Sequence, residues 1–332
     1  MLALARTRFG MERVDVRPPS LGPGEVLIRV RLVGLCRTDL AVARGEITVD
    51  APRILGHEMV GEVSAVGPGC RRFRGGESVS VDPVFHCGDC RRCHGDWKYA
   101  CLRRQFLGVD RDGALAELIV IPEQNVWRIS AELDDRASAM LEPMAACAAV
   151  LKAPIDRSER GLVVGTGRLA VLTTRALRVH GFGSVETLED DISTDASDGN
   201  RLFDFVIDTS GEPSAVQASL SYLRPQGRLV LKSRAASTLE LPLEFLIANE
   251  INVHGVNYLD FGKARHLLES SVVEVADLFG PVWPPEDADA AFAAAEDDPF
   301  RKHFLVPPGA RFTKSYASTD EVVDVRNHWL HL

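Results

Sequence analysis

The 332-residue chain has no long apolar run, and this absence limits the class of protein it can be. No stretch approaches the ~18 consecutive apolar residues of a membrane-spanning helix. The N-terminal segment MLALARTRFGMERVD is interrupted by Arg6, Arg8, Glu12 and Arg13. It therefore lacks the apolar core of ~7–15 residues that a secretory signal needs. Internal repeats and low-complexity segments are also absent, so we expect a globular, cytoplasmic protein with no membrane partner.

The sequence also lacks an excess of positive charge. It has 38 Lys and Arg against 47 Asp and Glu, which gives a net charge of −9. A broad basic face for nucleic acid is therefore not expected. A small phosphate-bearing ligand is still possible, because a helix N-terminus and a few arginines suffice to bind it. At about 100–200 residues per domain, the length favours two domains.

Cysteine is too scarce for a disulfide scaffold, with seven in the whole chain. Four of them, Cys87, Cys90, Cys93 and Cys101, fall within one short stretch. This spacing is typical of a tetrahedral zinc ion held by four thiolates at about 2.3 Å. Four protein ligands leave no position for a substrate, so we expect a structural site. The alternatives are four unrelated free thiols or a redox-active pair.

The order of secondary-structure signals predicts a β-rich first part and an α/β second part. Residues 25–35 alternate between apolar and polar side chains, as a half-buried strand does. Residues 135–151 are rich in alanine and favour a helix. Strand-like and helix-like segments then alternate through residues 161–233, which is typical of a parallel sheet. Further helices are expected at 262–270 and 286–296.

A second set of candidate metal ligands is spread along the chain. Cys36 ends the strand at 25–35, His57 and Glu58 begin a later strand, and Glu142 lies where the composition changes. One Cys, one His and one or two carboxylates form a mixed set that leaves a coordination position open, as in catalytic zinc sites. Each residue alone has an ordinary structural interpretation: a buried thiol, a hydrogen-bonded core histidine or a carboxylate near a helix N-terminus.

Residues 163–170 read VVGTGRLA, a G-x-G-x-x-A turn between a strand and a helix. Glycines at such a turn let the backbone approach a pyrophosphate, and the helix N-terminus favours its charge. An ordinary tight turn is the alternative. The residues that we expect to bind the cofactor here are Gly165, Gly167, Arg168 and Leu169.

Taken together, these motifs resemble those of the zinc-containing medium-chain alcohol and polyol dehydrogenases. The segment from Cys36 to Asp39, the run GHEMVGEVSAVG, the four-cysteine lobe, Leu-Glu-Pro at 141–143 and the glycine turn occur in that family's order and spacing. The resemblance covers residues 20–305. It implies a β-rich, GroES-like catalytic domain and a Rossmann domain with a doubly wound parallel sheet. The implied boundaries are 1–151 and 261–332 for the catalytic domain, 86–102 for its structural-zinc lobe, and 152–260 for the Rossmann domain.

The resemblance also implies roles for individual residues. Cys36, His57 and Glu142 correspond to ligands of a catalytic zinc, and polyol- and threonine-type members carry a carboxylate at the third position. Glu58 resembles the carboxylate that lies beside the metal and exchanges with substrate or water. The remaining roles are proton relay for Thr38, orientation of His57 by Asp39, contact with the cofactor pyrophosphate for Arg37, and the nicotinamide side of the crevice for Thr209 and Ser210.

The sequence departs from the family's pattern after the glycine turn. Glu189, 22 residues after Gly167, stands at the distance of the carboxylate that holds the adenosine ribose, which would favour NAD over NADP. The polar stretch DDISTDASDGNRLF that follows is too short for the strand and two helices that the family places there, since one helix takes ~11 residues. We therefore expect a reduced Rossmann domain. Two alternatives stay open: Glu189 belongs to an acidic surface loop, or SVETL is a later strand and the ribose-binding strand is missing.

The function that we expect is hydride transfer between NAD and a secondary alcohol of a polyol, sugar, cyclitol or amino alcohol, with NADP not excluded. Zinc lowers the pKa of a bound alcohol so that an alkoxide forms near neutral pH, and the nicotinamide accepts the hydride. We also expect two zinc ions per chain and a homodimer or homotetramer joined through the Rossmann sheets, with residues 239–256 as an interface element or a buried core strand. The alternatives are a redox-neutral zinc lyase or epimerase with weakened cofactor binding, and a non-enzymatic zinc-bearing partner subunit.

Overall fold

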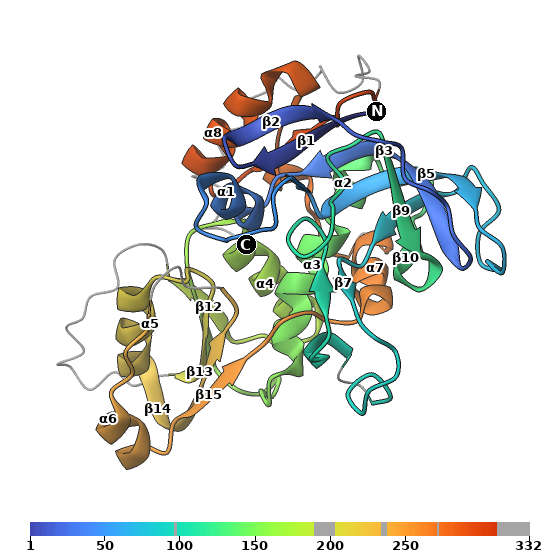
Figure 1. Ribbon diagram of the computed structural model, residues 1–332. Coiled ribbons are helices and arrows are strands. Elements are labelled where there is room, and N and C mark those ends of the chain that lie inside the picture. Colours follow the sequence, from blue (N-terminus) through green and yellow to red (C-terminus); the bar gives the residue numbers. More distant parts are fainter. Residues whose placement is uncertain (96–97, 189–202, 234–237, 271, 311–332) are drawn as a thin grey trace. The chain divides into compact units, whose positions relative to one another are not determined.

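A computed structural model of the chain describes residues 1–95, 98–188, 203–233, 238–270 and 272–310 (Figure 1). The chain divides into two compact units. The first unit comprises Met1–Met140 and Glu274–Leu332, and the second comprises Leu141–Val273. None of the described helices is long and apolar enough to cross a membrane.

The first unit is built mainly from antiparallel strands, as its sequence predicts. Its largest sheet has the order β10-β6-β5-β3-β17-β16, and β9 also pairs with β3. Smaller sheets have the orders β2-β1-β4 and β7-β8. The strands are β1 (Leu2–Thr7), β2 (Gly10–Asp15), β3 (Glu25–Gly34), β4 (Arg53–Ile54), β5 (Glu58–Val66), β6 (Ser78–Val81), β7 (Val84–Phe85), β8 (Gln105–Phe106), β9 (Leu118–Pro122), β10 (Val126–Arg128), β16 (Phe279–Trp283) and β17 (Lys302–Leu305).

Strand β3 forms the centre of this sheet because one of its faces is continuously apolar. Val26, Ile28 and Val30 are buried, whereas Arg29 between them is exposed, which confirms the predicted alternation. The strand leads directly into α1, which ends at Gly45 in a left-handed conformation with φ of 81°. The helices of this unit are α1 (Arg37–Arg44), α2 (Asp135–Ala139) and α8 (Ala288–Asp297), with short 3-10 turns η1 (Lys98–Ala100), η2 (Glu123–Asn125), η6 (Ala276–Leu278) and η7 (Pro285–Asp287).

The second unit contains a parallel sheet in the order β12-β11-β13-β14-β15. Alternate residues of its strands enter two separate apolar clusters. Val163 and Ile207 pack with α4 residues such as Leu177, and Leu162 and Val206 pack on the other face with residues of α5. The elements are α3 (Leu141–Cys147), η3 (Ala148–Lys152), β11 (Gly161–Val164), α4 (Arg168–Val179), β12 (Val185–Leu188), β13 (Phe203–Asp208), α5 (Pro213–Ser219), η5 (Leu220–Tyr222), β14 (Leu223–Leu231), α6 (Leu243–Ala248), β15 (Asn252–Gly255) and α7 (Phe261–Glu269).

This strand order identifies the sheet as a shortened doubly wound sheet. The full order of such a sheet is 3-2-1-4-5-6. The five strands that the described residues form reproduce this order without its first member, and β12 lies at the edge where that member would pair. The segment SVETL therefore contributes the strand that follows α4 and pairs with β11, so it is not the later strand of the alternative.

The alanine-rich stretch at 135–151 is helical, as its composition predicts, and is divided into three segments. It contains α2, then α3, then η3, and along the chain the boundary between the two compact units follows Met140, which lies between α2 and α3. Pro143 is the third residue of α3. Proline has no N–H to donate and is tolerated in the first turn of a helix, so its position is compatible with a new helix that starts at Leu141.

Candidate metal and nucleotide sites

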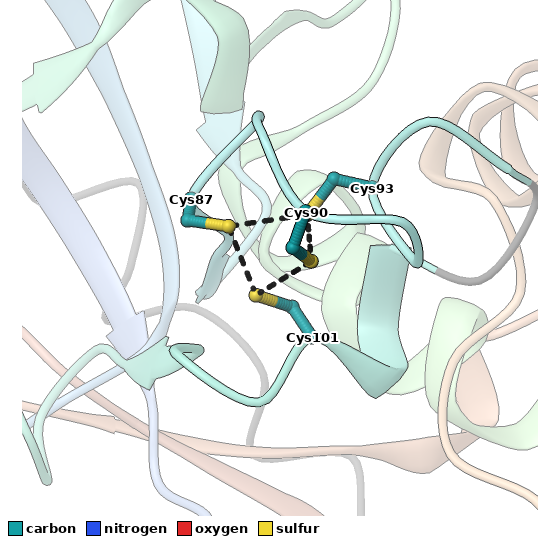
Figure 2. A group of neighbouring side chains, drawn as sticks. All are labelled: Cys87, Cys90, Cys93 and Cys101. Atoms are coloured by element: carbon teal, nitrogen blue, oxygen red, sulfur yellow. Dashed lines mark hydrogen bonds between the residues drawn. The ribbon is translucent and has the colours of Figure 1, made fainter.

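The four cysteines of the lobe at 86–102 converge on one point (Figure 2). Their Sγ atoms are 3.4 Å apart for Cys90 and Cys93, 3.5 Å for Cys87 and Cys101, 3.6 Å for Cys87 and Cys93, and 3.9 Å for Cys90 and Cys101. Zinc–sulfur bonds of about 2.3 Å in a tetrahedron place the sulfurs roughly 3.8 Å apart. All four cysteines are free of disulfides, so the distances and the donor chemistry fit a structural zinc ion.

The electrostatics of the lobe favour a bound cation. Desolvation and a hydrogen bond with Cys90 raise the pKa of Cys93 to about 12. Backbone N–H groups instead lower the pKa values of Cys90 and Cys101. The Cys93 thiol therefore resists ionisation beside its neighbours, and a divalent ion would supply the charge that stabilises four thiolates.

A second cluster forms where β3 and β5 lie side by side. Cys36 follows β3 and caps α1, and His57 immediately precedes Glu58, the first residue of β5. One ligand atom from each of these three residues lies within 4.8 Å of the other two. Their strands are held in register by pairing of Gly34 with Glu58. The structure thus brings Cys36 close to His57 and Glu58, which follow it by more than 20 positions in the sequence.

Asp39 contacts two of the segments that carry this cluster. Its carboxylate accepts hydrogen bonds from the backbone N–H groups of Cys36 and Gly56, both at 3.0 Å, and its Oδ1 lies 3.4 Å from His57 Nδ1. Burial would raise the pKa of Asp39, but His57 and these N–H groups lower it below its usual value. Burial would lower the pKa of His57, but Asp39 and Cys36 raise it well above its usual value. The pocket therefore stabilises positive charge beside the imidazole, which suits a metal cation.

Two further residues of this segment occupy the first turn of α1. Thr38 is half-buried and Arg37 is exposed. Their proposed contacts are with substrate and cofactor, which are not part of this structure. Their roles in the proton relay and at the pyrophosphate stay predictions.

Glu142 belongs to the second compact unit, in the first turn of α3. Its side chain is buried and accepts a hydrogen bond from Tyr258 Oη. Tyr258 itself is buried and precedes α7, which packs against α3. Sequence analysis did not single out Tyr258, because a lone tyrosine between a strand and a helix carries no distinctive signal.

Lys302 is a second residue that the sequence analysis missed. It opens β17, a strand whose residues are all buried, and its Nζ forms an ion pair with Glu58 Oε2. The side chains of Lys302 and Glu58 are 1% and 2% exposed. The available signal was a charged residue shortly before the apolar run Phe304–Val306, which alone does not reveal the partner.

The predicted nucleotide turn connects β11 to α4. Gly165 has φ of 134°, a value that favours glycine, and a Cβ there would lie 2.4 Å from Thr209 Oγ1. Gly167 caps α4, and Arg168 is its buried first residue, while Leu169 is half-buried. The bare backbone at Gly165 and the N–H groups at the start of α4 suit a pyrophosphate.

The end of β13 lies against this turn. Thr209 donates from its backbone N–H and from its Oγ1 to the carbonyl of Val164, at 2.9 and 2.8 Å. Ser210 is half-buried, and its Oγ donates to Asp208 Oδ1 at 2.5 Å. Glu189, the predicted ribose partner, lies outside the described residues.

Comparison with known proteins agrees with this architecture. Residues 22–131 match the alcohol dehydrogenase GroES-like domain, and residues 181–272 match the zinc-binding dehydrogenase family. L-threonine 3-dehydrogenase from Pyrococcus abyssi is 30% identical over 303 residues, covering 81% of this chain and 85% of that protein. Sorbitol dehydrogenase from Halalkalibacterium halodurans is 27% identical over 343 residues, covering 92% and 99%. The crystal structure of an alcohol dehydrogenase from E. coli CFT073 with NADH has a TM-score of 0.84 at 23% identity, covering 92% of this chain and 99% of that one.

These observations define the class of protein. The chain belongs to the zinc-dependent alcohol and polyol dehydrogenase family. It is a zinc-dependent alcohol oxidoreductase that acts on small alcohols, so the fold, the enzyme class and zinc as a cofactor are confirmed. The number of zinc ions per chain and the choice between NAD and NADP stay predictions.

Proposed function

We propose that this chain oxidises a secondary alcohol that carries further polar groups, with NAD as the hydride acceptor. The observation that carries the proposal is the convergence of Cys36, His57 and Glu58 within 4.8 Å. When bound there, zinc supplies Lewis-acid activation of the alcohol, and the nicotinamide takes up the hydride. Cys36, His57 and Glu142 are the residues that we assign to hold this ion, beside a second, structural ion held by the four lobe cysteines.

The protein's own side chains position the reacting groups. Asp39 keeps the His57 ring in a fixed orientation through its contact with Nδ1, which leaves Nε2 available for the metal. Thr38 is assigned to accept the proton of the alcohol hydroxyl and to pass it toward solvent. Glu58 is assigned as the carboxylate that exchanges with substrate beside the ion.

A polar substrate is supported by a hollow in the first unit. The hollow has a volume of about 330 Å³, and its lining includes Asp50, Arg104 and Asp110. Phe106, the neighbour in sequence of the lining residue Gln105, has its ring centroid 5.0 Å from that of His57. Side chains of both charges suit a polyol, sugar, cyclitol or amino alcohol better than a simple aliphatic alcohol. The names of the threonine and sorbitol dehydrogenases point to the same class.

The nucleotide would lie along the turn at 165–169. We assign Gly165, Gly167, Arg168 and Leu169 to the pyrophosphate side, together with Arg37. Thr209 and Ser210 are assigned to the nicotinamide side. Glu189 is kept as the residue that selects NAD over NADP.

The proposal also includes the domain boundaries, the oligomeric state and the cellular location. We assign residues 1–151 and 261–332 to the catalytic domain and 152–260 to the Rossmann domain. A homodimer or homotetramer in the cytoplasm is proposed. In support of an oligomer, Leu243 and Ile247 of α6 are 69% and 76% exposed, and Val253 on the edge strand β15 is 37% exposed.

The test is binding of NAD and NADP to the zinc-loaded protein by calorimetry, followed by alcohol-dependent reduction of the cofactor at 340 nm. Polyols, sugars, aminocyclitols and β-hydroxy amino acids form the substrate panel. Cys36→Ser should bind the nucleotide and retain the lobe zinc but lose turnover. A protein that binds neither nucleotide would contradict the proposal, and so would an active Cys36→Ser variant.

A further inference from the structure

Three neighbouring strands place a buried ion pair against the candidate catalytic metal site. Glu58 begins β5, Gly34 ends β3 and Lys302 begins β17. Gly34 pairs with Glu58 on one side and with Phe304 on the other, so β3 separates the two charged residues. The ammonium of Lys302 reaches across β3 to Glu58 Oε2. The pair therefore belongs to the framework of the main sheet.

Gly34 makes this reach possible. A Cβ at this position would lie 2.6 Å from Glu58 Oε2 and 3.2 Å from Lys302 Cδ. The first distance is shorter than any ordinary non-bonded contact, so a larger residue would force the carboxylate away. The absence of a side chain at Gly34 thus creates the space that both charged groups occupy.

Lys302 contacts both segments that carry the candidate ligands. Its Nζ also donates to the carbonyl of Leu35 at 3.2 Å, and Leu35 directly precedes Cys36. A buried ammonium is costly unless it is paired and hydrogen-bonded, and here both conditions are met. The lysine therefore links the residue before one ligand to the carboxylate of another.

The carboxylate of Glu58 has two possible partners. One of its oxygens lies within 4.8 Å of the ligand atoms of Cys36 and His57, close enough for a modest side-chain movement to reach an ion held there. The other partner is the ammonium of Lys302. An interaction of the carboxylate with the Lys302 ammonium weakens its interaction with the metal ion, because the same negative charge is shared.

We propose that Lys302 is a positioning residue that holds the Glu58 carboxylate back from the metal and thereby keeps one coordination position open for the alcohol. This inference rests on the proposed function, since it requires a metal ion at Cys36 and His57. Without the ammonium, Glu58 would neutralise its charge on the metal and occupy the position that the substrate needs.

The test measures access to the metal rather than turnover alone. Cobalt-substituted protein is titrated with imidazole, a small neutral ligand, and binding is followed by the visible absorption of Co²⁺. Lys302→Met should weaken imidazole binding by about tenfold or more, in the range seen when groups that orient metal ligands are removed. Lys302→Arg keeps the positive charge and should stay close to the wild type. Lys263→Met, at an exposed lysine of α7, is the matched control and should leave imidazole binding unchanged.

A double variant separates positioning from a purely structural role. If Lys302 acts through Glu58, the variant Lys302→Met/Glu58→Gln should bind imidazole as tightly as Glu58→Gln alone. The kcat of Lys302→Met should fall, because Glu58 then competes with the alcohol. Equal imidazole affinities in the wild type and Lys302→Met, with both bound metals retained, would overturn the inference.

Two further measurements cover the cases in which Lys302→Met does not fold or the second metal does not bind. If Lys302→Met does not fold, Gly34→Ala is used instead, because its Cβ would crowd both Glu58 Oε2 and Lys302 Cδ and so disturb the ion pair without removing either charge, and it should weaken imidazole binding in the same way. Unchanged binding in a folded Gly34→Ala protein would likewise overturn the inference. If the wild-type protein binds metal at the four-cysteine lobe alone, the proposed function fails before the role of Lys302 is reached.

Discussion

At the scale of single residues, the candidate active site depends on groups that orient the ligands. Asp39 contacts His57, Lys302 pairs with Glu58, and Tyr258 donates to Glu142. Each of the three candidate ligands beyond Cys36 thus has its own buried partner. Partners of this kind commonly change metal affinity by about 10–100-fold when they are removed.

Tyr258 provides the clearest test of Glu142 as a ligand. Tyr258→Phe removes the hydroxyl that donates to the buried carboxylate and leaves the ring in place. We expect the affinity of the second zinc to fall about tenfold, because the carboxylate loses the group that fixes its orientation. Competition with a chelator measures the affinity, with the lobe zinc as an internal reference. Tyr222→Phe in η5 is the control, and equal affinities in all three proteins would contradict the ligand role.

Gly165 tests the nucleotide turn in the same way. Gly165→Ala introduces a Cβ 2.4 Å from Thr209 Oγ1 at a backbone φ of 134°. We expect NAD affinity to fall more than about tenfold, equivalent to about 1.4 kcal/mol, because the backbone moves out of the position that suits a pyrophosphate. Gly183→Ala is the matched control, since a Cβ there meets nothing within 4 Å. Calorimetry that found equal NAD affinities would remove this turn from the site.

At the scale of elements, the sequence predicts what depends on local patterns. The alternation at Val26, Ile28 and Val30 correctly predicts β3, and the four-cysteine spacing correctly predicts that the sulfurs converge. The contact between Lys302 and Glu58 could not be predicted, because 244 positions separate the two residues and only the order of strands brings them together. The division of residues 135–151 into α2, α3 and η3 could not be predicted either, since alanine-rich composition does not show where one helix ends and the next begins.

We expect the lobe to be held by its proposed zinc ion rather than by a core of its own. Its long side chains point mostly to solvent, and Leu102 is 84% exposed. Cys90→Ser should therefore release the lobe zinc and lower the melting temperature by about 10 °C, because structural zinc contributes directly to folding and each kcal/mol lost shifts Tm by about 2–4 °C. Metal analysis and thermal unfolding measure the two effects. Cys70→Ser, at a half-buried thiol outside both clusters, is the control, and a Cys90→Ser protein with two zinc ions would contradict the assignment.

At the scale of the whole molecule, the two units differ in how fully they follow their family. The first unit contains its sheets, its lobe and the candidate ligands Cys36, His57 and Glu58 within the described residues. The sheet of the second unit has five strands there and is missing the member that would pair outside β12. In the chain, 14 residues, 189–202, connect β12 to β13. We therefore expect the proposed nicotinamide side, at Thr209, to be more complete than the proposed adenosine side.

The difference between the nicotinamide side and the adenosine side predicts how the binding free energy of the cofactor is distributed over its two halves. The adenosine half of NADH should contribute little, because the shortened connection leaves few residues to contact it. Reduced nicotinamide mononucleotide, which lacks that half, should therefore bind only about tenfold more weakly than NADH, a difference of about 1.4 kcal/mol. Fluorescence titration of both compounds on the zinc-loaded protein measures the ratio, and Gly165→Ala serves as a variant in which binding of both is weakened. A ratio of a thousandfold or more would mean that residues 189–202 form an adenosine site despite their length, and Glu189→Ala would then identify whether its carboxylate holds the ribose.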